Sequence, residues 1–251
     1  MRSFGMGSAN SVSLSLATAM QRSLDVAANN MSNASTAGYK AVRPLFESVS
    51  QNGNKNPEAT SYMRDKGNYM DTTQGALTPT GNQLDLAITG TGWFSYETRD
   101  GQVAYGRNGR LAVNANGQLT TLTGASILDD GGSPITLPEE VGQDVTVARD
   151  GTMTDNEGTL LGQIGLFRVL DPNQLNPIGN GLYLLPAGSP AAEPTSRSKI
   201  MQGYSERSNV EPAMEIIRLM EIQRTYERAV QVMNDANELT KQAIQRIART
   251  V

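Results

Sequence analysis

The sequence predicts an α+β protein, in which long N- and C-terminal helices pair as a coiled coil and a mainly antiparallel β domain is inserted between them. Three observations support this prediction. Apolar residues recur at spacings of three and four near both ends, the 25 glycines are concentrated in the middle, and no glycine follows Gly203. We therefore expect four segments, at residues 1–40, 41–80, 81–205 and 206–251.

The first segment is expected to be an N-terminal axial helix. The members of its apolar stripe are Ala17, Met20, Leu24, Ala27 and Met31. They are spaced three or four residues apart, as one face of a helix requires. We expect Gly38 to end this helix as a left-handed cap. Asparagine is unfavourable inside helices, so the cluster Asn29, Asn30 and Asn33 either sets the register of the helix in an assembly or satisfies the helix end.

The second and third segments lack helical periodicity. Residues 41–80 include a polar tract at residues 52–57, and we expect an extended connector there. From residue 81 onward, short apolar runs predict strands at 84–88, 93–96, 111–113, 119–122, 145–147 and 164–170. Dipeptides that favour tight hairpin turns separate them: Asp100-Gly101, Asn108-Gly109, Asn116-Gly117 and Asp150-Gly151. Regular strands and such turns predict an antiparallel β domain.

The fourth segment is expected to be a C-terminal axial helix from Pro212 to Thr250, capped by Ser208 or Asn209. Its heptad seam consists of Leu219, Ile222, Tyr226, Ala229, Met233, Ala236, Thr240, Ala243 and Ile247. A second apolar set consists of Val210, Met214, Ile217, Met220, Val232 and Leu239. Pairing with the N-terminal helix covers only one stripe of each helix, so we expect other chains to cover the second set.

Apolar stripes on both terminal helices predict a surface for contacts between subunits. A striped helix is more often part of an intramolecular bundle, but its occurrence at both extreme ends around a β insert favours assembly. The predicted subunit-contact residues are Met20, Leu24, Ala27, Asn30, Met31, Met214, Ile217, Leu219, Ile222, Tyr226, Met233 and Ile247.

Composition argues against several classes of function. The net charge is -4 without a dense basic patch, so we expect no nucleic-acid partner. The absence of His and Cys removes imidazole bases, thiolate nucleophiles and the usual zinc ligands, and we expect no enzyme activity, metal or cofactor. Gly90-x-Gly92 lacks the third glycine of a dinucleotide fingerprint and is expected to be a hairpin turn.

The sequence also bears on secretion by the Sec pathway and on membrane insertion. Residues 1–20 contain no continuous apolar region or small-residue cleavage site, so we expect no cleaved Sec signal peptide. No stretch approaches the ~18 consecutive apolar residues of a membrane-spanning helix, and we expect no direct membrane insertion.

Four segments in order along the chain resemble the flagellar rod and hook family of axial proteins. They are residues 24–40, which contain Asn-Asn, Asn, Thr and Gly-Tyr-Lys, then 81–94, 105–128 and 203–227. The short connector and the ending at residues 242–249 are most similar to proximal rod members of that family. Met31-Ser32 and Gly106 depart mildly from the family pattern.

The resemblance implies a non-enzymatic subunit of the flagellar basal-body rod, exported unfolded through the flagellar type III apparatus. It implies an inner coiled-coil layer, an outward β domain, and polymerisation with copies of itself and with other proximal and distal rod subunits into a tube that spans the periplasm and transmits torque to the hook. Three alternatives stay open: a distal rod protein, a soluble β-domain binding module dimerised by its helices and, with the least support, an enzyme.

Overall fold

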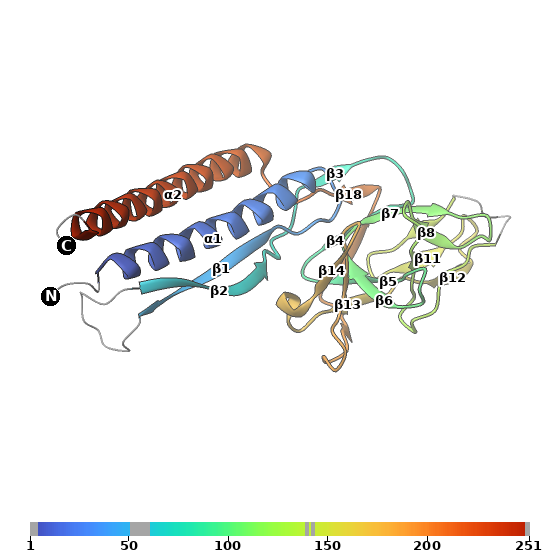
Figure 1. The fold of residues 1–251 in the computed structure, drawn as a ribbon. Coiled ribbons are helices and arrows are strands. Elements are labelled where there is room, and N and C mark those ends of the chain that lie inside the picture. The colour runs from blue at the N-terminus through green and yellow to red at the C-terminus, as the bar shows by residue number, and fades with distance from the viewer. Residues whose placement is uncertain (1–4, 51–60, 139–140, 142–143, 249–251) are drawn as a thin grey trace. The chain divides into compact units, whose positions relative to one another are not determined.

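The computed structural model of the chain describes residues 5–50, 61–138, 141 and 144–248, and within these it leaves the side chains of residues 5–10, 50, 243, 244, 247 and 248 undescribed (Figure 1). The chain forms two compact units. Unit 1 comprises residues 1–32, 42–69 and 211–251, and unit 2 comprises residues 33–41 and 70–210. The chain therefore passes between the units four times, at 32/33, 41/42, 69/70 and 210/211.

Unit 1 is built around two long helices. It contains α1 (Gly5–Ser32), α2 (Pro212–Ala248), and the paired strands β1 (Val42–Ser50) and β2 (Ser61–Met70). In Figure 1, α1 runs between α2 and the two-stranded ribbon, and α1 packs against both α2 and β1. Accordingly, α1 is buried on two neighbouring faces. One face includes Ala17 and Ala27, and the other includes Ala19, Ser23 and Val26.

Both terminal helices occur where the sequence predicts them. Helix α2 begins at Pro212, whose fixed φ suits a first helical turn. The predicted caps are wrong, however. Gly38 does have a left-handed φ of 68°, but α1 already ends at Ser32. Asn209 does not cap α2, because its side chain binds the backbone of residues 41, 71 and 73, and the Ser208 hydroxyl accepts the N–H of Val210.

Unit 2 is a mainly antiparallel β structure. Its strands are β3 (Leu77–Pro79), β4 (Asp85–Thr89), β5 (Trp93–Glu97), β6 (Val103–Gly106), β7 (Gly109–Val113), β8 (Leu119–Thr121), β9 (Ser126–Ile127), β10 (Thr146–Val147), β11 (Thr152–Thr154), β12 (Leu160–Gln163), β13 (Leu166–Arg168), β14 (Asn176–Gly179), β15 (Leu182–Leu184), β16 (Glu193–Pro194), β17 (Lys199–Gln202) and β18 (Tyr204–Glu206). The short 3-10 helix Pro172–Gln174 lies between β13 and β14.

The largest sheet has the order β14-β15-β6-β5-β9-β8-β7-β4-β17, and β13 joins β5 and pairs with β16. Strands β10-β11-β12 form a second sheet, and β18 pairs with β3. The main core gathers buried side chains from β4, β5, β8 and β17, among them Leu86, Phe94, Leu119 and Ile200. An α+β fold with an inserted antiparallel domain, as predicted, is therefore confirmed in its element types and order.

The predicted strands of the β domain all overlap observed strands, namely β4, β5, β7, β8, β10 and β13. Three of the four predicted hairpin glycines, Gly101, Gly117 and Gly151, have positive φ in turns between paired strands. The fourth prediction is wrong. Gly109 starts β7, where glycine is needed because a Cβ atom would lie 1.9 Å from the carbonyl oxygen of Leu86.

Two further segments differ from the expected picture. The expected connector at 41–80 contains β1, β2 and β3, and its polar tract at 52–57 lies outside the described residues. Gly90-x-Gly92 is not a hairpin turn, because it joins β4 to β5, and these strands pair with other strands instead. In the part of the chain that the structure describes, no helix is long and apolar enough to span a membrane.

Candidate functional site

One side of α2 exposes a row of apolar side chains. This outer apolar face, as we call it, consists of Met214, Ile216, Ile217, Met220, Val232 and Leu239, each between 45% and 56% exposed. At 100° per residue, four of the six fall within about 60° of one another around the helix axis. Single exposed apolar residues are ordinary, but a group of them on one side of a helix is typical of a surface that another chain covers.

The other side of α2 is the predicted heptad seam. Its seven described side chains, from Leu219 to Thr240, are all at least partly shielded, and Ala229 is 4% exposed. Helix α1 packs against α2 within unit 1. The two apolar sets predicted from the sequence therefore differ in environment: the seam is shielded inside unit 1, whereas most of the second set is open to solvent. Val210 is the exception and is buried in unit 2.

The predicted subunit-contact residues divide in the same way. Ala27 and Asn30 are buried, and seven are partly buried: Met20, Leu24, Met31, Leu219, Ile222, Tyr226 and Met233. Met214 and Ile217 are exposed on the outer apolar face. The side chain of Ile247 lies outside the described residues. Their role between subunits stays a prediction.

Asn30 connects α1 to the start of β1. Its amide nitrogen donates to the carbonyl oxygen of Val42 at 2.8 Å, and its amide oxygen accepts the N–H of Val42 at 2.9 Å. The side chain is fully buried. It thus satisfies the backbone at the start of a strand, and its effect on register in an assembly stays a hypothesis.

A charged cluster lies at the start of α2. Glu215 is 1% exposed and accepts hydrogen bonds from the guanidinium groups of Arg43 and Arg218 on the same oxygen, Oε1. Its second oxygen, Oε2, has no partner among the described residues. These residues line a groove of about 380 Å³ whose other walls include Met20 and Ile222. Burial raises the pKa of the Glu215 carboxyl, while Arg43 opposes this shift.

This pKa shift predicts a pH dependence of unit 1. The folded pKa of Glu215 lies above its ordinary value of 4.5, so the folded state binds the proton more tightly than the unfolded chain. The stabilisation from this group is therefore fully present below pH 4.5 and is lost as pH rises through the folded pKa. Glu215→Gln should remove this contribution to the change of the free energy of unfolding with pH. Unfolding of unit 1, which contains α1 and α2, can be followed by helical circular dichroism at several pH values. The same pH dependence of stability in wild type and variant would contradict a raised pKa of Glu215.

A second, fully buried ion cluster lies in unit 2. Glu206 Oε1 accepts from Lys40 Nζ at 2.8 Å and from the N–H of Gly75 at 3.1 Å, and Oε2 accepts from Arg107 Nε at 2.8 Å. All three charged side chains are at most 3% exposed. Burial lowers the pKa of the Lys40 ammonium, and Glu206 opposes this shift. One carboxylate thus neutralises part of the charge of two buried cations.

Backbone carbonyls complete the surroundings of Arg107. Its NH1 donates to the carbonyl oxygens of Gly90 and Gly92 at 2.8 and 2.6 Å, and its NH2 donates to that of Ile88 at 3.0 Å. The glycine pair that begins like a dinucleotide fingerprint therefore holds an arginine of the same chain. Such a buried network stabilises a fold when every member is satisfied.

The cluster joins the separated segments on which the sequence resemblance depends. Lys40 belongs to the first segment, Gly90 to the second, Arg107 to the third and Glu206 to the stretch 203–227. These charged residues were not predicted as a site from the sequence. Lys40 and Glu206 are 166 residues apart, and no periodicity connects them. The only available signal was that each lies within or beside a matched segment.

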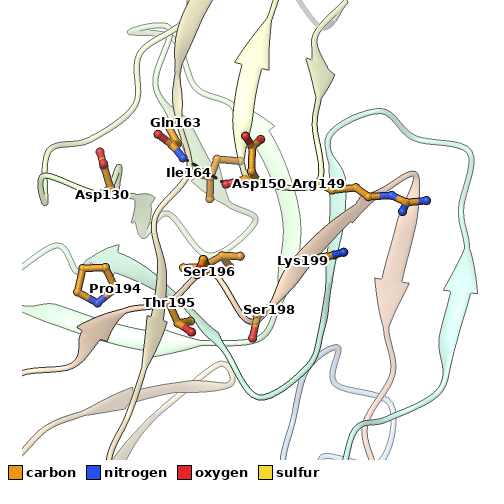
Figure 2. Close-up of a pocket in the computed structure, with 11 residues that line it drawn as sticks. Asp130, Arg149, Asp150, Gln163, Ile164, Pro194, Thr195, Ser196, Ser198 and Lys199 are labelled. Carbon is orange, nitrogen blue, oxygen red and sulfur yellow. Dashed lines mark hydrogen bonds between the residues drawn. The ribbon is translucent and has the colours of Figure 1, made fainter.

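Unit 2 also has an open cleft of about 460 Å³ (Figure 2). Figure 2 shows Arg149 and Lys199 on one side of it and Asp130 on the other, all of them exposed. The buried hydroxyl of Ser198 on its wall already accepts the N–H of Gly92 at 2.8 Å. Among the described residues, none of the buried polar atoms without a partner lines this cleft.

Three family models match the chain. They are described as "Flagella basal body rod protein" at residues 12–40, "Flagellar hook protein FlgE/F/G D1 domain" at residues 87–155 and "Flagellar basal body rod FlgEFG protein C-terminal" at residues 201–246. The first match lies on α1 and the segment that follows it, the second on unit 2, and the third runs from β17 to α2.

Whole proteins are similar over almost the full length. The flagellar basal-body rod protein FlgF of Caulobacter vibrioides is 37% identical over 248 residues, covering 97% of this chain and 99% of that protein. FlgF of Mesorhizobium japonicum is 37% identical over 237 residues, covering 93% and 95%. The basal-body rod protein FlgG of Agrobacterium fabrum is 34% identical over 246 residues, covering 88% and 92%.

Proposed function

The chain belongs to the flagellar basal-body rod protein family, and we propose that it is a FlgF-like structural subunit of the proximal rod. In this role it assembles with copies of itself and with other rod subunits into a helical shaft that transmits motor torque to the hook. The outer apolar face of α2 is the observation that carries the proposal, because it offers another subunit an apolar helical surface that unit 1 leaves uncovered.

The two apolar sets on α2 suit two different contacts. The seam residues pair α1 with α2 as a coiled coil inside each subunit, which is supported by their shielding in unit 1. Met214 and Ile217 then make heterologous contacts, which can propagate as a helix of subunits rather than close into a pair. In this arrangement torque passes through packing and hydrogen bonds, and the subunit performs no enzymatic reaction.

The location and route follow from the family. We infer that the subunit resides in the rod within the periplasm and reaches it through the flagellar type III export apparatus, without a cleaved Sec signal peptide. Its partners are proximal and distal rod subunits, and neither nucleic acid nor direct membrane insertion is involved. Support for this route is the similarity to the rod protein family.

The proposal is tested by placing a charge on the outer apolar face. Ile217→Asp should leave the isolated subunit folded, with a change in free energy of unfolding within about 0.5 kcal/mol, because the side chain is exposed. In cells where it replaces the natural chain, we expect rods to fail to assemble and swimming to be lost, because a buried unpaired charge is costly at an interface.

Asn234→Asp is the matched control, since it adds the same charge at an exposed polar position of α2. Cells carrying it should swim normally. Normal swimming with Ile217→Asp would exclude the outer apolar face as a contact surface. Intact rods in cells that lack the chain altogether would refute the proposed function, and a small soluble oligomer with a ligand in the unit 2 cleft would favour the binding-module alternative.

A further inference from the structure

Three segments of unit 2 lie next to points where the chain crosses to unit 1. Residues 38–41 precede the crossing at 41/42, residues 71–75 follow the crossing at 69/70, and residues 206–210 precede the crossing at 210/211. They are distant in sequence, yet direct backbone hydrogen bonds connect them. The N–H of Asp71 donates to the carbonyl oxygen of Ala41 at 2.8 Å, and the N–H of Gly38 donates to that of Glu206 at 2.9 Å.

The side chain of Asn209 bonds to the other two segments at once. Its amide oxygen accepts the N–H of Ala41 at 2.7 Å. Its amide nitrogen donates to the carbonyl oxygens of Asp71 and Thr73 at 2.8 and 3.1 Å. One side chain of the third segment therefore holds the first and the second segment together.

Lys40 and Glu206 add charge-assisted bonds to the same three segments. Lys40 Nζ donates to the carbonyl oxygen of Thr73 at 2.7 Å and to Glu206 Oε1 at 2.8 Å. The same Glu206 oxygen accepts the N–H of Gly75. Hydrogen bonds to charged groups are stronger than neutral ones, and the Lys40 and Glu206 side chains are buried away from competing water.

The crossing at 41/42 is held on both of its sides. Ala41 is bound by the amide of Asn209 within unit 2, and Val42 is bound by the amide of Asn30 within unit 1. Two successive residues thus each have their backbone fixed by an asparagine of their own unit. Tension along the chain at this peptide bond therefore acts on a hydrogen-bonded residue on either side of it.

We propose that Lys40, Glu206 and Asn209 form a clasp that carries mechanical load where the chain passes between its two units. Force exchanged between the units must pass at least in part through the covalent crossings, and three of the four lead into segments held by the clasp. Because the clasp bonds these segments to one another, the load is shared among them. The role as a load path in a rotating shaft rests on the proposed function, whereas the clasp itself can be tested on the isolated chain.

The decisive experiment pulls single molecules of the full chain. The sequence contains no cysteine, so Arg228→Cys in unit 1 and Asp100→Cys in unit 2, both exposed, give unique attachment points. In this background Asn209→Ala should speed the first extension step at constant force about tenfold or more, the order expected when several hydrogen bonds across one barrier are removed.

Asn114→Ala is the control for the loss of asparagine hydrogen bonds in unit 2. Asn114 accepts two backbone N–H groups and bonds one side chain, all within the turn between β7 and β8. It should leave the first extension step unchanged, even where its effect on thermal unfolding of unit 2 equals that of Asn209→Ala. Equal rates of the first extension step for the two variants would refute the load-bearing role of the clasp, whatever their thermal stabilities.

The same pair of variants tests the role in the rod. Cells with Asn209→Ala should swim in dilute medium and lose speed more steeply than Asn114→Ala cells as viscosity rises. A parallel loss of speed in both strains would refute the load path in the rod. If the proposed rod function is wrong, rods will form in cells that lack the chain. That outcome would not affect the result of the single-molecule experiment.

Discussion

Replacing Glu206 with glutamine is expected to lower the free energy of unfolding of unit 2 by about 3–5 kcal/mol, the usual cost of breaking a buried ion pair from one side. Among the described residues, the Glu206 carboxylate forms salt bridges with both Lys40 and Arg107, and all three side chains are at most 3% exposed. Glutamine keeps the shape of the side chain but removes the salt-bridge partner of both buried cations. The measurement is denaturant unfolding followed by fluorescence of Trp93, the single tryptophan, which is buried in unit 2.

The matched control is Glu193→Gln, which breaks the ion pair between Glu193 and Arg168 in the same unit. Both of these side chains are about half exposed, so the expected cost is below about 1 kcal/mol. Similar losses for Glu193→Gln and Glu206→Gln would mean that burial does not strengthen the Glu206 cluster.

A double-mutant cycle separates the charge interaction from simple loss of packing. Lys40→Met should destabilise unit 2 in the wild-type background, because Glu206 loses one of its two cations and the carbonyl of Thr73 loses a donor. In the Glu206→Gln background the same change should cost much less, since it then removes an unpaired buried charge. Additive effects of the two changes would contradict the direct coupling of these residues.

Helix periodicity predicts unit 1 well because its signal is local. Spacings of three and four place Ala17 and Ala27 on a buried face of α1 and bring Leu219 and Ile222 to the shielded side of α2. The exposure of Met214 also agrees with a second apolar set that one partner helix cannot cover. The β1–β2 pair was missed because its strands show no alternation of apolar and polar residues, and packing against α1 stabilises β1 instead.

Long-range partners could not be predicted in the same way. A dipeptide such as Asn116-Gly117 encodes its turn within a few residues, whereas Asn108-Gly109 has the same composition and starts a strand. Gly109 is needed because the backbone carbonyl of Leu86 lies against it, and this carbonyl comes close to residue 109 only when the chain folds. The clasp is an extreme case, because its residues come from opposite ends of the chain and none has a local partner that would reveal its role.

Gly38→Ala is expected to destabilise unit 2 by at least about 3 kcal/mol through the same long-range packing. A Cβ atom at this position would lie 2.4 Å from the carbonyl carbon of Arg107 and 2.5 Å from the backbone nitrogen of Asn108. Neither atom can rotate away as a side chain would, so the backbone must move. Arg107 belongs to the buried ion cluster, and the N–H of Gly38 donates to the backbone carbonyl oxygen of Glu206. The shift should therefore weaken the cluster as well.

Gly81→Ala isolates the steric part of this effect. Gly81 has a left-handed φ of 73°, close to the 68° of Gly38, but a Cβ atom there would meet nothing within 4 Å. Its expected cost is only the backbone strain of alanine in that conformation, about 1–2 kcal/mol. The difference between the two variants, measured by Trp93 fluorescence, then reports the close approach of residue 38 to the backbone of Arg107. Equal costs would show that Gly38 is required for its conformation alone and that the segment before Lys40 can shift without disturbing the ion cluster.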